Sequence, residues 1–193
     1  MRKVFSVTFA LIVLLCLATS VQALQSKTIQ RDNGASASAS WSKTNGDLIT
    51  NNYLSVTKSN AGTDIYLDVY TWDSTNGNFV NEKSGYMFTK DNVFSIDKKL
   101  NSASLSNVDV EVYNWDTDKT EILPVMADWS GTGDVSTGSS SYASTDGDYR
   151  FRSTSSSSYR DASATGSINN NDLGQSNYGS LNSFKNAYID MMK

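Results

Sequence analysis

Histidine is absent from this 193-residue chain, and cysteine occurs once, at Cys16. Cys16 lies in the apolar part of an N-terminal segment that has the pattern of a cleaved export signal, so we expect the mature chain to contain neither residue. Zinc, copper and haem sites and most nucleophile–base pairs need an imidazole or a thiolate. The sequence therefore excludes these sites, and carboxylate catalysis is the one enzymatic chemistry that we consider.

Proline also occurs only once, and no run of basic residues is present. A single proline leaves the interiors of β-strands almost uninterrupted. The chain has 16 Lys+Arg and 20 Asp+Glu, so loss of Arg2 and Lys3 with the signal leaves 14 against 20, a net charge of −6. An acidic chain without a basic patch is a poor partner for nucleic acid or an anionic membrane surface. We expect neither as a partner, and the oligomeric state is left open.

The N-terminal segment has the three parts of a secretory signal peptide. Residues 1–3 are positively charged, residues 4–18 are almost continuously apolar, and Val21 and Ala23 occupy the −3 and −1 positions of a cleavage site. The apolar run of about fifteen residues is shorter than the roughly 20 that a membrane-spanning helix needs. We therefore predict a signal peptide at residues 1–23 and a secreted protein, located outside the cell or at the cell surface.

The rest of the chain is dominated by alternating apolar and polar residues. Residues 35–41 alternate Ala with Ser and end in Trp41, and further segments of this kind are separated by Asn-Gly, Ser-Gly and Asp-Gly pairs. This pattern is typical of an all-β fold, and we predict a single antiparallel β-sandwich of jelly-roll or immunoglobulin-like style over residues 24–168. The other expected strands are 53–57, 64–72, 79–88, 93–96, 103–105, 108–115, 121–126, 149–153 and 159–168, with a mobile loop at 130–145 and a hairpin tip at 155–158.

The C-terminal part, residues 169–193, has a different pattern. Residues 169–179 are polar and predict a connector, and Ser180 is a suitable N-cap for a helix after it. Apolar residues then recur at helical spacing, which predicts one short amphipathic helix that docks on the sandwich because it is too short to be stable alone. These apolar residues are Leu181, Phe184, Tyr188, Ile189 and Met192.

Two segments, 65–73 and 108–116, share the pattern acidic–Val–Tyr–x–Trp–Asp. In each, aliphatic residues occupy one strand face, and aromatic residues and carboxylates occupy the other. If the two strands are neighbours, the rings form a platform on which sugars stack, while the carboxylates accept hydrogen bonds from the sugar hydroxyl groups. The alternative is that these rings pack across strands or under the helix. The candidate ligand-binding residues are Tyr66, Asp68, Tyr70, Trp72, Glu111, Tyr113 and Trp115.

The leading functional prediction is a non-catalytic binding module for an extracellular glycan or cell-surface polymer. One alternative is a structural or matrix protein that assembles through strand edges and the Ala/Ser segment 35–41. The other is a small glycosidase in which Asp68 and Glu111 are the two acids, which requires them to lie about 5–9 Å apart. The leading prediction assigns no catalytic residue to the chain.

Calcium is the one metal that the composition leaves open. Oxygen-rich turns occur at residues 73–78, 116–121 and 145–148. None has the spacing of a helix–loop–helix calcium site, and Asn, Asp and Gly are also the ordinary residues of turns. We therefore predict no cofactor and no metal ligand, with structural calcium as the alternative.

Overall fold

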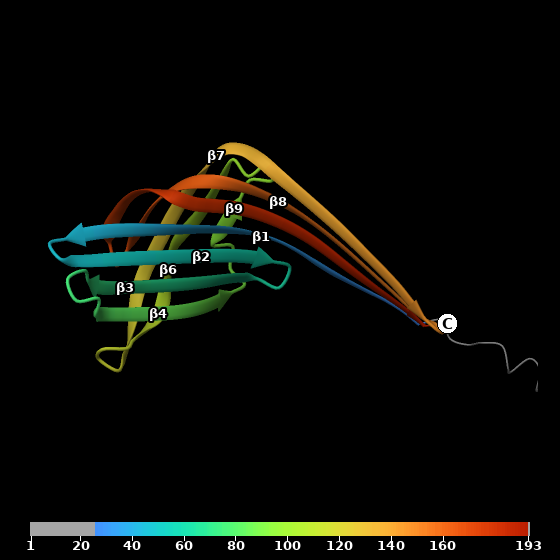
Figure 1. Ribbon diagram of the computed structural model, residues 1–193, viewed down its shortest axis with the longest axis horizontal. Coiled ribbons are helices and arrows are strands. Elements are labelled where there is room, and N and C mark those ends of the chain that lie inside the picture. Colours follow the sequence, from blue (N-terminus) through green and yellow to red (C-terminus); the bar gives the residue numbers. More distant parts are fainter. Residues whose placement is uncertain (1–25, 193) are drawn as a thin grey trace, which may run out of the picture. The chain divides into compact units, whose positions relative to one another are not determined.

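The computed structural model describes residues 26–192, and every regular element in this part of the chain is a β-strand (Figure 1). The all-β prediction is therefore confirmed, while the predicted signal peptide lies outside the described residues. Among residues 26–192 no helix has the length and apolar character that a membrane span requires. The strands are β1 (Ser26–Asn45), β2 (Leu48–Ser59), β3 (Thr63–Asp73), β4 (Phe79–Thr89), β5 (Phe94–Ile96), β6 (Ser102–Asn114), β7 (Lys119–Asp146), β8 (Tyr149–Ile168) and β9 (Asn171–Met192).

All nine strands form one sheet in the order β4-β3-β2-β1-β9-β8-β7-β6-β5. β4 also pairs with β6, where Lys83 lies opposite Asn114 and Ser84 opposite Tyr113. We call this short pairing the seam, because it joins two distant strands of the sheet and closes the sheet on itself. The prediction of a sandwich is wrong: closure gives the sheet a buried inner face, so no second sheet is needed to cover it.

The described residues divide into two compact units. The larger unit comprises residues 32–140 and 155–186, and the smaller comprises residues 26–31, 141–154 and 187–192. In the smaller unit the Tyr149 hydroxyl donates a hydrogen bond of 2.6 Å to Asp190, and the Tyr142 ring packs against Phe151. The hydrophobic core and the aromatic residues of the repeated segments belong to the larger unit.

The inner face of the sheet holds the hydrophobic core. On β6 the residues Val108, Val110 and Val112 alternate with exposed residues, as a half-buried strand requires. Small side chains on β1 and β8 leave room for large ones, of which Trp129 and Phe94 meet edge to face at 6.3 Å. The small buried residues are Ala37, Ala39, Ala162 and Ala164, and the other large ones include Leu54, Ile65, Leu67, Leu105 and Leu181.

The predicted C-terminal helix is also wrong, because its residues Leu181, Phe184, Tyr188, Ile189 and Met192, together with the expected N-cap Ser180, all belong to β9. This strand lies between β1 and β8, so neighbours on both sides satisfy its backbone, and this pairing overrides a weak local helical pattern.

The Ser- and Gly-rich segments 130–145 and 155–158 are likewise strand, in β7 and β8, rather than the predicted loop and hairpin tip. The connector shrinks to a two-residue turn at Asn169 and Asn170. Their φ angles of 52° and 60° are those of a tight hairpin turn in which Asn is favoured.

Candidate functional site

The two repeated segments lie on β3 and β6, which are not neighbours, because β4 runs between them. Their candidate residues still belong to one surface, since Asp68 on β3 lies opposite Ser84 on β4, and Ser84 lies opposite Tyr113 on β6. Ile65 and Leu67 alternate with the aromatic residues of β3 and are fully buried, so the aromatic residues are on the outer face. We call the seven candidate residues and the surface they occupy the aromatic face.

Trp115 joins the parts of the aromatic face that come from β4 and β6. Its backbone N–H donates to the carbonyl oxygen of Glu82 at 3.0 Å, and its indole Nε1 donates to the Ser84 hydroxyl at 3.2 Å. Its ring meets Tyr113 edge to face, with centroids 4.8 Å apart. The indole is thus fixed beside the seam, yet 61% of the residue is exposed, so the ring remains accessible to a ligand.

Further aromatic residues extend the aromatic face beyond the seven that the sequence suggested. Tyr53 on β2 packs against Tyr66 at 6.2 Å, and Phe79 meets the edge of Tyr70 at 6.0 Å. Tyr86 lies opposite Tyr66 on β4 and is 62% exposed. Strand 79–88 was expected, but only the observed register shows that its aromatic side chains join the same surface.

The carboxylates of the aromatic face differ in environment. Asp68 is half-buried, and burial raises the pKa of its carboxyl group, whereas Glu111 is exposed. Asp68 lies two strands away from β6, about 10 Å across the sheet, and Glu111 lies further along β6 than Tyr113, the residue level with Asp68. This separation is larger than the distance between the paired acids of a glycosidase, so the geometry does not support the glycosidase hypothesis.

Tyrosine hydroxyls on this side of the sheet are held by aspartates. Tyr86 donates a hydrogen bond to Asp64, and Tyr113 donates one to Asp118. Each hydrogen bond stabilises the protonated phenol beside a negative charge and so raises the pKa of that tyrosine. Burial, followed by the charge of Asp68, does the same for Tyr66. The tyrosines therefore stay neutral, and their rings are fixed in position.

Three hollows lie on or near β1 and β2, and one of them borders the aromatic face. The outer hollow, of about 520 Å³, contains Tyr70, Trp72 and Phe79 together with the polar residues Ser42 and Asn51. Ser42 and Asn51 also line the rim hollow, of about 370 Å³, which continues to β9. The rim hollow is further lined by Ser40, Trp41, Leu173, Gln175, Ser176, Asn177 and Tyr178.

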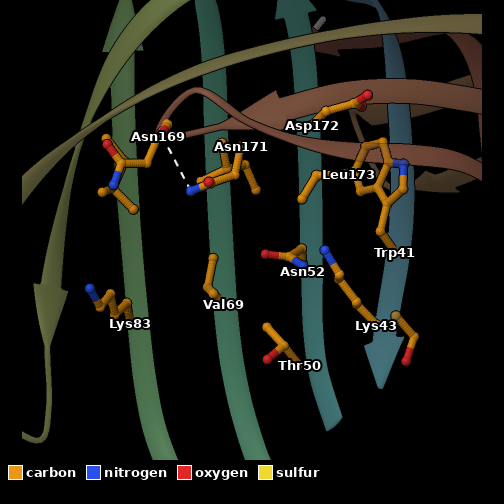
Figure 2. A pocket seen from close by; sticks show the side chains of 13 residues that line it. Trp41, Lys43, Thr50, Asn52, Val69, Lys83, Asn169, Asn171, Asp172 and Leu173 are labelled. Atoms are coloured by element: carbon orange, nitrogen blue, oxygen red, sulfur yellow. Dashed lines mark hydrogen bonds between the residues drawn. The ribbon is translucent and has the colours of Figure 1, made fainter. Parts of the chain in front are cut away.

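The third hollow, the end pocket, has a volume of about 330 Å³ and shares Trp41, Ser42 and Leu173 with the rim hollow. Figure 2 shows Lys43 of β1 and Asn52 of β2 extending into it, with Asn169 and Asn171 on the opposite side. Trp41 is only 4% exposed, and its indole Nε1 finds no hydrogen-bond partner among the described residues. The outer hollow and the rim hollow share Ser42 and Asn51 on the outer side of the sheet, whereas the end pocket lies on the inner side, where Val69 and Leu123 also line it.

In the first of the three oxygen-rich turns, 73–78, the aspartate is engaged by the chain itself. Asp73 accepts hydrogen bonds from the backbone N–H of Thr75 at 2.8 Å, from the Thr75 hydroxyl at 2.6 Å and from Asn76 at 2.9 Å. These bonds lower the pKa of Asp73. Within residues 26–192 no group of three or more Asp, Glu, His or Cys is placed to hold a metal ion.

No protein family, curated protein sequence or solved structure that was compared with the chain matches it.

Proposed function

We propose that this chain is an exported, non-catalytic binding module for an extracellular glycan or a similar polyhydroxylated cell-surface polymer. The observation that carries the proposal is an exposed surface of aromatic rings with polar groups beside them. Trp115, Phe79 and Tyr86 are each more than half exposed, and such a concentration of apolar surface on a soluble unit usually marks a binding site. An aromatic ring offers an apolar face to sugar C–H groups, and nearby amides and hydroxyls orient the ligand.

The outer hollow and the rim hollow, which share lining residues, support an extended ligand rather than a single small molecule. The outer hollow and the rim hollow share Ser42 and Asn51, and together they extend from the aromatic residues of β3 to β9. Their side chains are mainly neutral amides, hydroxyls and rings, and the chain as a whole is acidic. These features favour an uncharged or weakly charged polysaccharide, because a polyanion would be repelled by the net charge.

The test begins with a glycan array that is probed with the purified mature protein. We expect retention of neutral oligosaccharides, and a similar loss of binding in Trp72→Ala and Trp115→Ala, because both rings belong to the aromatic face. Loss of one stacking ring, at about 1–1.5 kcal/mol, weakens binding about tenfold. Failure of every array glycan to bind would contradict the proposal.

Two control variants separate binding from folding. Tyr159→Ala removes an exposed ring on β8, away from the hollows, and should leave glycan binding unchanged. Trp129→Ala removes a core ring that is 1% exposed and whose Nε1 donates to the carbonyl oxygen of Ser38 at 2.9 Å. It should cost about 3–5 kcal/mol of stability. Folded Trp72→Ala and Trp115→Ala proteins that bind like wild type would also contradict the proposal.

A further inference from the structure

Three polar side chains meet inside the sheet, at the seam between β4 and β6. Lys83 comes from β4, Asn114 from the end of β6 and Glu121 from the start of β7. The Lys83 Nζ lies 2.6 Å from Oε2 of Glu121, and the Asn114 Nδ2 donates to Oε1 of Glu121 at 2.8 Å. One carboxylate therefore holds an amine and a carboxamide at the same time, one on each of its oxygens.

The carbonyl oxygen of the same carboxamide is also bound. Asn114 Oδ1 accepts hydrogen bonds from the backbone N–H groups of Asp116 at 3.1 Å and Thr117 at 3.2 Å. These bonds fix which side of the amide faces Glu121, because only the NH₂ group can donate to a carboxylate. Two N–H groups directed at a carbonyl oxygen also stabilise the negative charge that develops there when a nucleophile attacks the carbon.

Strand pairing brings the amine within reach of the amide carbon. Lys83 and Asn114 are directly opposed on antiparallel strands, and Cα atoms of such partners are about 4.5–5.5 Å apart. A lysine and an asparagine side chain together easily span this distance. Asn114 is only 3% exposed, so water competes poorly with the amine for the amide carbon.

We propose that Lys83 and Asn114 join in an intramolecular isopeptide bond, with Glu121 transferring protons and the Asp116 and Thr117 N–H groups stabilising the oxyanion. Glu121 first takes a proton from the Lys83 ammonium, which leaves a neutral amine. The amine attacks Cγ of Asn114, and the resulting tetrahedral centre carries its negative charge on Oδ1. Glu121 protonates Nδ2, and the Cγ–Nδ2 bond breaks. The new amide nitrogen then passes its extra proton through Glu121 to the departing ammonia, which leaves as ammonium.

The reaction is balanced without any co-reactant. One C–N bond forms and one C–N bond breaks, no atom is oxidised or reduced, and the products are a secondary amide and ammonium. Lys83 also lines the end pocket, which gives the leaving ammonia a route to solvent. In the unlinked chain the Lys83 hydrogen bond, with a second from Asn114, lowers the pKa of Glu121. The charged pair of Lys83 and Glu121 is therefore the resting form, and transfer of the Lys83 proton to Glu121 is energetically unfavourable. The reaction needs this step only once in the life of each chain.

The chain contains a natural control for simple proximity. Lys58 Nζ donates a hydrogen bond of 2.7 Å to Oδ1 of Asn92, but this pair is exposed. Among the hydrogen bonds of the described residues, no carboxylate joins Lys58 to Asn92, and the amine faces the amide oxygen rather than sharing an acid with the amide nitrogen. We therefore expect no bond between Lys58 and Asn92.

The test is mass spectrometry of the purified, folded mature protein. We expect an intact mass lower than the calculated mass by one ammonia, and a branched peptide in a protease digest that joins the segments containing Lys83 and Asn114. Lys83→Ala and Glu121→Gln should restore the full mass, whereas Lys58→Ala should keep the loss.

Cyclisation at an Asn-Gly pair, Asn33-Gly34, Asn45-Gly46 or Asn76-Gly77, also releases ammonia. That loss would persist in Lys83→Ala and would map to a linear peptide, so the digest distinguishes the two sources. The wild-type digest decides the matter even if a variant fails to fold. Recovery of linear, unlinked peptides for both Lys83 and Asn114 from aged, folded wild-type protein would overturn the proposal.

Discussion

Replacing Gly85 with alanine should open the seam, because Gly85 lies on β4 where the backbone of β6 approaches most closely. A Cβ atom at this position would lie 2.2 Å from the carbonyl oxygen of Glu111 and 2.7 Å from Cγ1 of Val112. Carbon atoms in contact are normally about 3.5–4.0 Å apart. The two strands must therefore separate by about 1 Å, because the first of these neighbours is backbone and cannot rotate away.

The size of the effect follows from what holds the seam together. Only two residue pairs, Lys83 with Asn114 and Ser84 with Tyr113, join β4 to β6, and the Trp115 N–H adds a bond to Glu82. Overpacking costs about 1–3 kcal/mol, and each hydrogen bond that is stretched or lost adds about 0.5–1.5 kcal/mol. We expect a loss of about 2–4 kcal/mol in the free energy of unfolding, a large part of a typical domain's stability. For a domain of this size the thermal midpoint should fall by about 5–15 °C.

The matched control is Gly138→Ala, which adds the same methyl group on β7. There the nearest atom is the Ser157 hydroxyl oxygen at 3.7 Å, an ordinary contact, so the change should be neutral or stabilise by up to about 1 kcal/mol. Both variants are compared by urea and thermal denaturation, and again in a Lys83→Ala background that removes the proposed amide bond. If Gly85→Ala is as stable as Gly138→Ala in that background, the close approach of β4 and β6 is refuted.

Two further predictions concern acid and redox conditions. The hydrogen bonds to Asp73 lower its pKa, so the stabilisation they give is present above the pKa of an unfolded aspartate, about 3.9, and is lost as the pH falls through the lower folded value. Asp73→Asn should therefore be less stable than wild type near neutral pH, with the difference shrinking in acid; a gap that widens in acid would reverse this reasoning. The mature chain, without Cys16 and without histidine, should show a thermal midpoint that is unaffected by reductant and nearly constant from about pH 6 to 8. A shift of several degrees in either titration would be incompatible with that composition.

The alternating segments of the sequence predicted the strands well, because a strand with one buried face must repeat every two residues. Every segment expected to be a strand lies within an observed strand, apart from one residue at an end of 93–96 and of 108–115, but many of the observed strands are much longer. The long extensions of β7 and β8 were missed because Ser, Thr and Gly carry no hydrophobic period. They become strands through their neighbours in the sheet, as does the C-terminal segment that was expected to be a helix.

Closure of the sheet was beyond prediction, since it depends on two residue pairs between β4 and β6, which stand near opposite ends of the strand order in the sheet. The aromatic face was identified in part, from the repeat on β3 and β6, but its continuity depends on β4. The sequence also contains a sign of the polar cluster that Lys83, Asn114 and Glu121 form at the seam. Asn114 follows the inward-facing Val112 by two residues, and Glu121 precedes the inward-facing Leu123 by two. Because side chains two residues apart on a strand point to the same face, both are polar residues that face the core and need hydrogen-bond partners there.

The seam also determines how this chain behaves toward other copies of itself. A sheet normally ends in two unpaired strands, and such strands recruit further chains into aggregates or fibrils. In the larger unit the two terminal strands of the sheet, β4 and β5, both pair with β6, and β5 is only three residues long. Little unpaired strand edge therefore remains to which another chain could add a strand. Fibre formation along that route would first have to separate β4 from β6, so resistance to aggregation and the integrity of the core depend on the same two residue pairs.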